Sequence, residues 1–215
     1  MQVAQVNIAG EDLELHPYRA IWWKAESTLL MADLHIGKAA HFRKEGIQVP
    51  LAIIQINLQK FAALLSYYHP KQVFMLGDLF HSDANHEWGL FIDLLSEYPN
   101  IDFHLIVGNH DDLKALSLID HNMTVHKSDL DLGPFCLSHH PKESFTEDKY
   151  HLCGHLHPGV KLKGIGKQQL KLACFHFSKH QGILPGFGEL TGKYLLPIKK
   201  EDLVFVVTEE AVIPV

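Results

Sequence analysis

The chain has little cysteine, and its cysteines lack the spacing that would give them a chemical role. Cys136, Cys153 and Cys174 form no C-x-x-C pair, and an odd number cannot complete a disulfide framework. We therefore expect three buried free thiols. Such thiols are typical of a protein of the reducing cytoplasm, and a cytoplasmic location is expected here.

Long apolar runs are also missing. None approaches the ~20 residues that a membrane-spanning helix needs, and the first residues lack the basic start and apolar core of a secretion signal. These absences predict a soluble, unprocessed protein with no membrane partner. A length of 215 residues with 47% hydrophobic content fits a single domain over residues 1–215.

The chain has no excess of positive charge either. Its formal net charge of -6 argues against a protein that coats nucleic acid through overall charge, although a local basic patch is still allowed. Partner choice must then come from a specific site. Histidine, by contrast, is abundant, with 17 residues, which suggests that some imidazoles have a chemical role.

The order of apolar segments predicts an α/β fold. Residues 3–23 alternate as a hairpin and a further strand would, and buried strands are expected at 28–32, 73–76 and 103–107. Helices are expected from Pro50 onward and over residues 86–98, which predicts right-handed crossovers and a parallel sheet in the first half. Short β-rich runs then predict a mixed or antiparallel sheet, at 135–138, 149–153, 160–165, 169–174 and 204–208.

Two further expectations concern the segments around these elements. The polar, basic residues 37–46 have no clear period and are expected to form a loop over the site. Trp22, Trp23 and Trp88 are expected in the core.

Polar residues follow five of the apolar segments where strands would end. A buried parallel strand delivers polar side chains to its carboxyl edge, and in extended chain Asp33 and His35 would point to the same side and reach one ion. A lone Asp-x-His pair is usually structural, but five such ends predict ligands that converge on metal. The residues are Asp33 and His35, Asp78 and His81, Asn109, His110 and Asp111, His139 and His140, and His155 and His157.

This order of motifs resembles the calcineurin-like metallophosphoesterase family, from about Thr28 to His157. The resemblance implies a four-layer α/β/β/α sandwich with two divalent ions at the carboxyl edges of two stacked sheets. It assigns Asp33, His35 and His157 to the first ion, Asn109, His139 and His155 to the second, and Asp78 to a bridge between them. The family often has His-Gly where this chain has His139-His140, so either imidazole can be the ligand, and we favour His139.

The ligand types agree with this assignment. Imidazole combined with carboxylate and amide oxygen suits a transition metal, for which we expect manganese, with iron or zinc as alternatives. Cysteine is absent from the set, which disfavours a structural zinc site. Two such ions would activate water for attack on phosphorus, so the expected reaction is phosphoester hydrolysis.

Three residues beside the expected ligands are candidates for catalysis. By the family pattern His110 is not a metal ligand, and we expect it to donate a proton to the leaving oxygen, with Asp111 orienting its imidazole. His81 either contacts the phosphate, as its counterpart does in the repair-nuclease branch of the family, or orients a ligand. The sequence leaves both roles for His81 open.

Stretches outside the metal motifs are similar to the bacterial ligase-associated DNA-damage-response endonucleases. They cover residues 41–50, 154–159 and 184–192, while residues 171–177 depart from that subfamily. The resemblance implies a manganese-dependent phosphodiesterase that cuts DNA, single-stranded or structured, beside a ligase and a helicase. A small-molecule phosphodiesterase or phosphomonoesterase and, further off, a non-catalytic interaction module on the same fold are the alternatives.

A local basic patch supports a nucleic-acid substrate. Lys38, Arg43 and Lys44 follow the first ligand pair and are expected to contact phosphates. A second group of lysines follows the last ligand pair and is either a further contact or a solvated strand face. Its members are Lys161, Lys163, Lys167 and Lys171. Base stacking on Phe42 or Phe187 is a further possibility.

Overall fold

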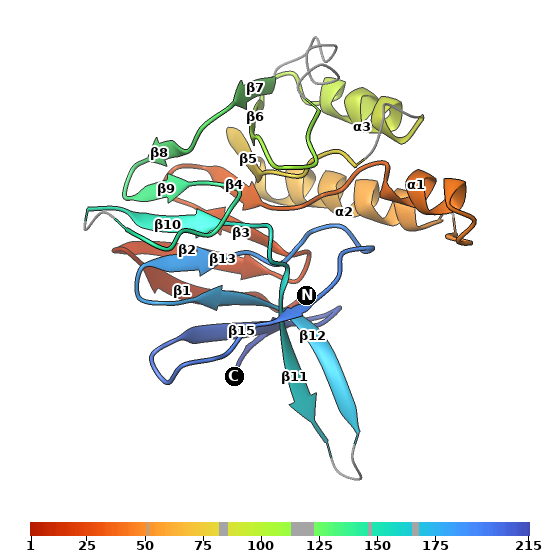
Figure 1. Cartoon of the computed structure of the whole chain (residues 1–215). Coiled ribbons are helices and arrows are strands. Elements are labelled where there is room, and N and C mark those ends of the chain that lie inside the picture. Colours follow the sequence, from red (N-terminus) through yellow and green to blue (C-terminus); the bar gives the residue numbers. More distant parts are fainter. Residues whose placement is uncertain (51, 82–85, 113–122, 146–147, 165–167) are drawn as a thin grey trace.

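Two β-sheets stack face to face in the computed structural model, which describes residues 1–50, 52–81, 86–112, 123–145, 148–164 and 168–215 (Figure 1). The first sheet has the order β1-β2-β3-β4-β5-β6-β7, antiparallel up to β4 and parallel from β4 to β7. Its strands are β1 (Ala4–Ile8), β2 (Glu11–His16), β3 (Ala20–Trp23), β4 (Thr28–Met31), β5 (Gln72–Leu76), β6 (Asp102–Ile106) and β7 (Met123–His126).

The second sheet is mixed. It has the order β14-β11-β12-β13-β10-β9-β8, with β15 paired to β12 and β16 paired to β15. Within it, β9, β10 and β13 run parallel to one another. Its strands are β8 (Leu130–Leu132), β9 (Phe135–Leu137), β10 (Tyr150–Cys153), β11 (Pro158–Lys163), β12 (Gln169–Phe177), β13 (Gln181–Ile183), β14 (Tyr194–Leu195), β15 (Leu203–Val207) and β16 (Val212–Pro214).

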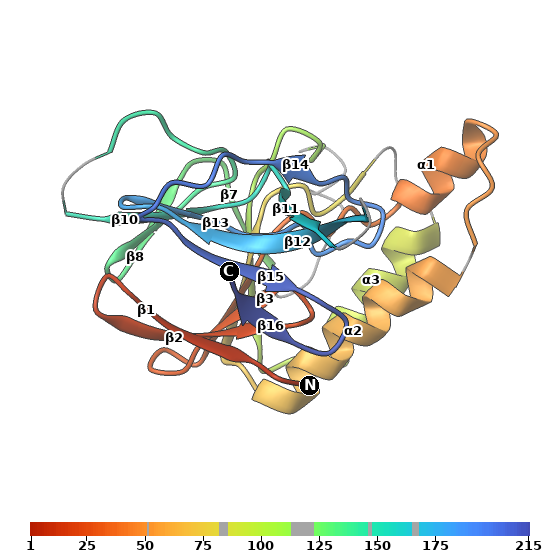
Figure 2. The same cartoon turned by 90° about the horizontal axis from the view of Figure 1, so that it is seen from below.

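The three described helices lie beside the first sheet (Figures 1 and 2). They are α1 (Lys38–Lys44), α2 (Ala52–Tyr68) and α3 (His86–Ser96). Phe61 of α2 and Phe91 of α3 pack on residues of β4 and β5 such as Met31 and Met75. Because α1 and α2 connect β4 to β5 and α3 connects β5 to β6, the crossovers place this cover on one face of the parallel strands.

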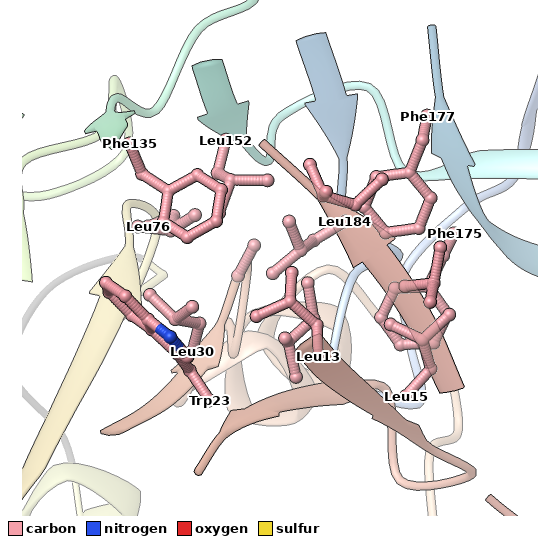
Figure 3. Packing of buried hydrophobic residues seen from close by; sticks show 14 of the residues in the cluster. Leu13, Leu15, Trp23, Leu30, Leu76, Phe135, Leu152, Phe175, Phe177 and Leu184 are labelled. Atoms are coloured by element: carbon pink, nitrogen blue, oxygen red, sulfur yellow. The ribbon is translucent and has the colours of Figure 1, made fainter. Parts of the chain in front are cut away.

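The main core fills the space between the two sheets (Figure 3). Leu30 and Leu76 point inward from the first sheet, whereas Leu29 and Met75 point to the helices, as the two-residue period of a strand requires. From the second sheet, Phe135, Leu152 and Phe175 meet them. Strands covered on both faces explain the continuous apolar runs of the sequence.

The outer face of the second sheet is covered differently. His151 and His176 lie on this face, since their neighbours in the strands face the core, and Gln181 lies on it because it is directly opposite His151 in the register. All three are buried. Phe145 stacks on the ring of His180 and meets the ring of His151 edge to face. The Gln181 side chain accepts the backbone N–H of Lys142. Asp202 accepts a hydrogen bond from His176. Within the described residues, the segments that cover this face are therefore irregular chain and not a helix.

Most sequence expectations for the fold are confirmed. The α/β sandwich, the parallel first half and the mixed second half are present, and Trp23 and Trp88 are buried. The expectation of a loop over residues 37–46 is wrong, because Lys38–Lys44 form α1, whose Gly37 N-cap has a left-handed backbone. No helix in the described part of the chain is long and apolar enough to cross a membrane.

Phe135 is a direct test of the packing between the sheets. Its ring is fully buried and meets Trp23 edge to face at a centroid distance of 5.1 Å. We expect Phe135→Ala to lower the free energy of unfolding by about 3–5 kcal/mol, since it removes a large side chain and leaves a cavity. Denaturant unfolding measures the change. Ile47→Ala, at a side chain that is 54% exposed, should stay within about 0.5 kcal/mol, and an equal loss in both variants would contradict this account of the core.

Candidate metal centre

The polar residues predicted at strand ends do converge on one edge of the sandwich. In the first sheet they follow the parallel strands β4, β5 and β6, and in the second they follow the parallel strands β9 and β10. Backbone bonds from Asp33 N to Gly77 O (3.1 Å) and from His35 N to Asp78 O (2.9 Å) join the loops after β4 and β5. The carboxyl ends of two sheets therefore supply one site.

One group of ligand atoms comes from Asp33, His35 and His157. Their side-chain nitrogen and oxygen atoms lie within 4.8 Å of one another. His157 Nε2 is 3.3 Å from Asp33 Oδ1, and neither atom has a hydrogen-bond partner in the described structure, nor has His35 Nε2. Buried polar atoms are normally satisfied, so three such atoms aimed at one space fit a cation.

A second group surrounds His139, which is 2% exposed. Its Nδ1–H donates to the carbonyl oxygen of Leu76 at 3.0 Å, which leaves a lone pair on Nε2 in the neutral ring. That Nε2 faces Asn109 Oδ1 at 3.1 Å and His155 Nδ1 at 3.2 Å. An amide oxygen is itself an acceptor, so the pair with Asn109 gains nothing unless a cation lies between the atoms.

Asp78 lies between the two groups. Its Oδ1 is 3.4 Å from His139 Nε2, and its Oδ2 is 3.9 Å from His35 Nε2. Asp33, Asp78 and His139 also form a grouping of their own within 4.8 Å. One carboxylate oxygen turned to each group is the arrangement that a bridging ligand requires.

The positions of His139 and His140 indicate which of the two imidazoles is the better candidate for a metal ligand. His139 is buried and oriented by Leu76, whereas His140 is exposed and lies beside the ring of His155 at a centroid distance of 4.3 Å. Both imidazoles come within reach of His155. The orientation of His139 Nε2 toward Asn109 and Asp78 supports it as the ligand, with His140 at the mouth of the same group.

The backbone at the ligands is not extended, and this corrects the geometry expected for Asp33 and His35. Asp33 has φ 55° and His35 has φ 50°, and Asp78, His155 and His157 are also left-handed. The side chains of Asp33 and His35 meet because the chain turns twice in the left-handed region, and not because residues two apart share a strand face. L-residues avoid this region, so tertiary contacts must hold it.

Two glycines let the ligands approach the backbone. A Cβ at Gly77 would lie 2.1 Å from His139 Nδ1, and Gly77 itself has φ 78°. A Cβ at Gly108 would lie 2.3 Å from Asp78 Oδ1. No larger residue fits at either position while the ligands keep their places.

Burial sets the protonation of the imidazoles. It lowers the pKa of His35 to about 2, and the positive charges of Lys38 and His157 act in the same direction. The pKa of His155 is also lowered, first by burial and then by His139 and His140. Neutral imidazoles offer lone pairs, which is the form that a metal ion binds.

His110 lies at the mouth of the site and is exposed. Its ring centroid is 4.8 Å from that of His81 and 5.7 Å from that of His35, and its backbone N–H donates to Asp78 Oδ1 at 2.9 Å. Asp78 therefore fixes where the His110 backbone stands.

Asp111 has a different partner from the one expected. Its Oδ2 accepts the N–H of Gly108 at 2.8 Å, and its Oδ1 accepts the N–H of Phe80 at 3.1 Å. Burial raises the pKa of the carboxyl to about 6, while these two bonds act against that shift. Asp111 therefore ties the loop after β6 to the loop after β5, and its role in orienting the His110 imidazole stays a prediction.

His81 stands among three other imidazoles. Its ring is 5.3 Å from His35, 5.1 Å from His41 and 4.8 Å from His110 between centroids. Burial lowers its pKa to about 4, with Lys38 adding to the effect. His81 thus faces the site as a neutral ring, a state that fits either of its two predicted roles.

The basic residues after the first ligand pair separate into different environments. Burial lowers the pKa of Lys38, against the carboxylates of Asp33 and Asp78, so this ammonium belongs to the centre itself. Arg43 pairs with the buried Glu87 at 3.1 Å, and Glu87 also accepts the N–H of Gly37 at 2.9 Å. Arg43 is therefore a tie between α1 and α3, while Lys44 is exposed, and a contact of either residue with DNA stays a prediction.

Two other expectations are also resolved by burial. Phe187 is 2% exposed and packs with α2, so stacking of a base on it is excluded, while Phe42 is partly exposed. Lys161 and Lys171 are exposed on β11 and β12. Lys167 lies outside the described residues, as does the side chain of Lys163.

Arg19 is a supporting residue that the sequence analysis missed. Its Nη1 donates to the carbonyl oxygens of Gly186 (3.0 Å), Phe187 (3.4 Å) and Gly188 (3.2 Å). That loop in turn bonds the centre, because Phe187 N donates to Ala32 O and Gly188 N to Asp33 O. The partners are 167 to 169 positions apart along the chain, so no local pattern could have indicated them.

Comparison with known proteins establishes which fold the chain has. No family model and no curated protein matches the chain. Among solved structures, the Pseudomonas putida nuclease MPE has a TM-score of 0.84 and 28% identity over 100% of both chains. The chain has the metallophosphoesterase fold. An Escherichia coli phosphoesterase, Yfce, has a TM-score of 0.43 and 13% identity over 84% of this chain and 87% of that chain.

The metallophosphoesterase fold and the converging imidazoles both point to a metal-binding site. Buried His/Asp groups are present where the strand ends of both sheets meet, and their unpaired atoms suit metal ions. The assignment of individual ligands to individual ions stays a prediction.

Asp78 provides the first test of this centre. Asp78→Asn keeps the shape of the side chain but removes the charge that faces both groups, so we expect metal content to fall from about two ions per chain to below one. Elemental analysis of the purified protein measures it. Asp12→Asn, at an exposed strand residue, is the control. Loss of one ion with full retention of the other would refute the bridging position.

Arg19 provides the second test. Arg19→Met keeps the apolar stem but removes the fork that holds three carbonyl oxygens, so the loop behind Asp33 should loosen. We expect metal affinity to fall by about 10-fold or more, the range for residues that support ligands. Metal titration measures the affinity, and unfolding in chelator measures the stability of the metal-free fold. Lys24→Met is the control, and unchanged affinity would show that Arg19 acts on stability alone.

Proposed function

We propose that the protein is a two-metal phosphodiesterase that cuts DNA, single-stranded or structured, in the course of DNA repair. The observation that carries this proposal is the likeness of the whole chain to the Pseudomonas putida nuclease MPE. The facing ligand groups around Asp78 support it, since they open to solvent through Asn109 and His110.

The ligand set favours manganese, with iron or zinc as alternatives. Asp33, His35 and His157 would hold one ion, Asn109, His139 and His155 the other, and Asp78 both. When bound, such ions lower the pKa of water and polarise the phosphoryl oxygens. The protein side of the reaction then depends on what surrounds the ions.

His110 is placed to assist the leaving group. Its ring is exposed while its backbone is fixed by Asp78, and the loop carrying it is tied by Asp111. A positioned imidazole can give a proton to the departing oxygen. His81 stands next to it and would either bond a phosphate oxygen or keep His35 in place.

Lys38 would add charge at the same point. It is half-buried and close enough to Asp33 and Asp78 for both carboxylates to act on its pKa. A cation in this position favours a phosphate held by the ions. The proposed setting is the cytoplasm, which the three free cysteines favour. The proposed association with a DNA ligase and a helicase rests on the subfamily resemblance alone.

The proposed roles of His110 and His35 differ, and this difference can be measured. His110→Ala should keep its metals and its melting temperature but lose about 10²-fold or more in turnover, the usual contribution of a general acid. His35→Ala should lose metal. Hydrolysis of a chromogenic phosphodiester with Mn²⁺, together with metal content, separates the two.

The class of substrate is tested by assaying DNA and small phosphoesters side by side. Purified protein with Mn²⁺ should cleave single-stranded, duplex or circular DNA on a gel and should hydrolyse a chromogenic diester better than the monoester. Activity on small esters without any cleavage of DNA would replace the nuclease with a small-molecule phosphoesterase. No hydrolysis by the metal-loaded protein would leave an interaction module.

A further inference from the structure

The hairpin of β11 and β12 begins at the candidate centre and leads away from it. β11 starts at Pro158, directly after His157, and extends with β12 beyond the rest of the second sheet (Figure 1). β14 pairs with β11 at Pro158, and Tyr194 N donates to the carbonyl oxygen of His157 at 3.0 Å. The base of the hairpin is thus anchored to the last expected ligand.

Two lysines face each other across this hairpin. Lys161 and Lys171 are directly opposite in the register, so their side chains leave the same face, and both are exposed. Like charges in this position destabilise a pair of strands. Within the described residues neither lysine makes an ion pair, so nothing in this part of the chain neutralises them.

A third lysine, Lys193, joins this face from the residue just before β14. Gly159, opposite Ala173, lies on the same face as Lys161, and a Cβ at Gly159 would lie 2.9 Å from the Cβ of Lys193. Lys193 is exposed as well. The three lysines therefore form one basic face. It begins at Gly159, two residues after His157, where the side chain of Lys193 lies.

This basic face borders a hollow of 640 Å³ between the hairpin and α2. Arg19, Lys60, Lys171 and Lys193 line it with the carboxylates Glu189 and Glu209. Glu189 pairs with Arg19 and with Lys60, and the four cationic side chains that line the hollow outnumber its two carboxylates. The opposite face of the hairpin is apolar, with Leu162 paired to Leu170.

We propose that Lys161, Lys171 and Lys193 form a track for the phosphates of a nucleic-acid strand whose scissile bond lies at the metal centre. The inference rests on the proposed function, and it adds the path that the nucleic-acid strand follows across the surface. Lysines on a strand face recognise the backbone as point charges, so the contact is independent of base sequence. A linear polyanion can contact every cation of a row that starts at a phosphoesterase site, whereas a small ester cannot.

The test neutralises the track by the combined change Lys161→Gln, Lys171→Gln and Lys193→Gln. Binding of a single-stranded oligonucleotide, followed by fluorescence anisotropy from low to high salt, should lose about 0.7 units of log-log slope per lost contact, or roughly 2 units in all. Cleavage of the same DNA at subsaturating concentration should fall about 10-fold or more. Hydrolysis of the chromogenic diester should fall far less, because that substrate does not reach the hairpin.

Two controls isolate the basic face. Leu170→Gln changes the opposite face of the same hairpin, and combined neutralisation of Lys24, Lys199 and Lys200 removes as much charge from exposed positions elsewhere. Neither should alter the salt slope by more than a few tenths. Circular dichroism melting of every variant excludes a change of fold.

The outcomes separate this inference from the function on which it rests. An unchanged salt slope and unchanged DNA cleavage in the track variant, with the wild type active on DNA, would overturn the track alone. A wild type that binds and cuts no DNA would overturn both. An equal effect from Leu170→Gln would show that the hairpin acts through its apolar face, and the track would again be wrong.

Discussion

Repulsion between buried lone pairs is the constraint on which the rest of the centre depends. His139 donates through Nδ1 to Leu76, so its Nε2 faces Asn109 Oδ1 at 3.1 Å and Asp78 Oδ1 at 3.4 Å with a lone pair. Such contacts are unfavourable without a cation or a proton between the atoms. The fold holds them in place through the other polar atoms of the same residues, as in the bond from His139 to Leu76 and the bond from His155 N to Asp33 Oδ2.

Backbone strain at the ligands belongs to the same arrangement. Asp33, His35, Asp78, His155 and His157 all have a positive φ, and each such residue costs on the order of 1 kcal/mol or more. The bonds of Asp33 and His35 to the loop after β5, and of Gly188 to Asp33, hold the strained turns from both sides. Because ligands and strain coincide, the free energy of metal binding can offset part of this cost.

The sequence predicted the ends of the strands but not the geometry that follows them. Apolar runs followed by Asp33, Asp78 and Asn109 mark parallel strands that deliver ligands to one edge, and a local pattern is enough to indicate this. The left-handed turns, the partners of Asp111 and the burial of Phe187 depend on contacts made across the sandwich. Arg19 illustrates the limit, since its acceptors lie on a loop about 170 positions away and carry no signal in their side chains.

The placement of charge explains how an acidic chain can still offer a positive site to a phosphate, as the proposed function requires. The whole molecule has a formal charge of -6, yet only Asp33 and Asp78 supply carboxylates to the expected ligand set, and Lys38 stands beside them. Two divalent ions would leave that point net positive, so the attraction for phosphate is focused there and is weak elsewhere. An overall basic protein would bind polyanions anywhere on its surface. Under the proposed function, a nucleic-acid strand that reaches the centre would meet Lys161, Lys171 and Lys193 along the direction set by β11.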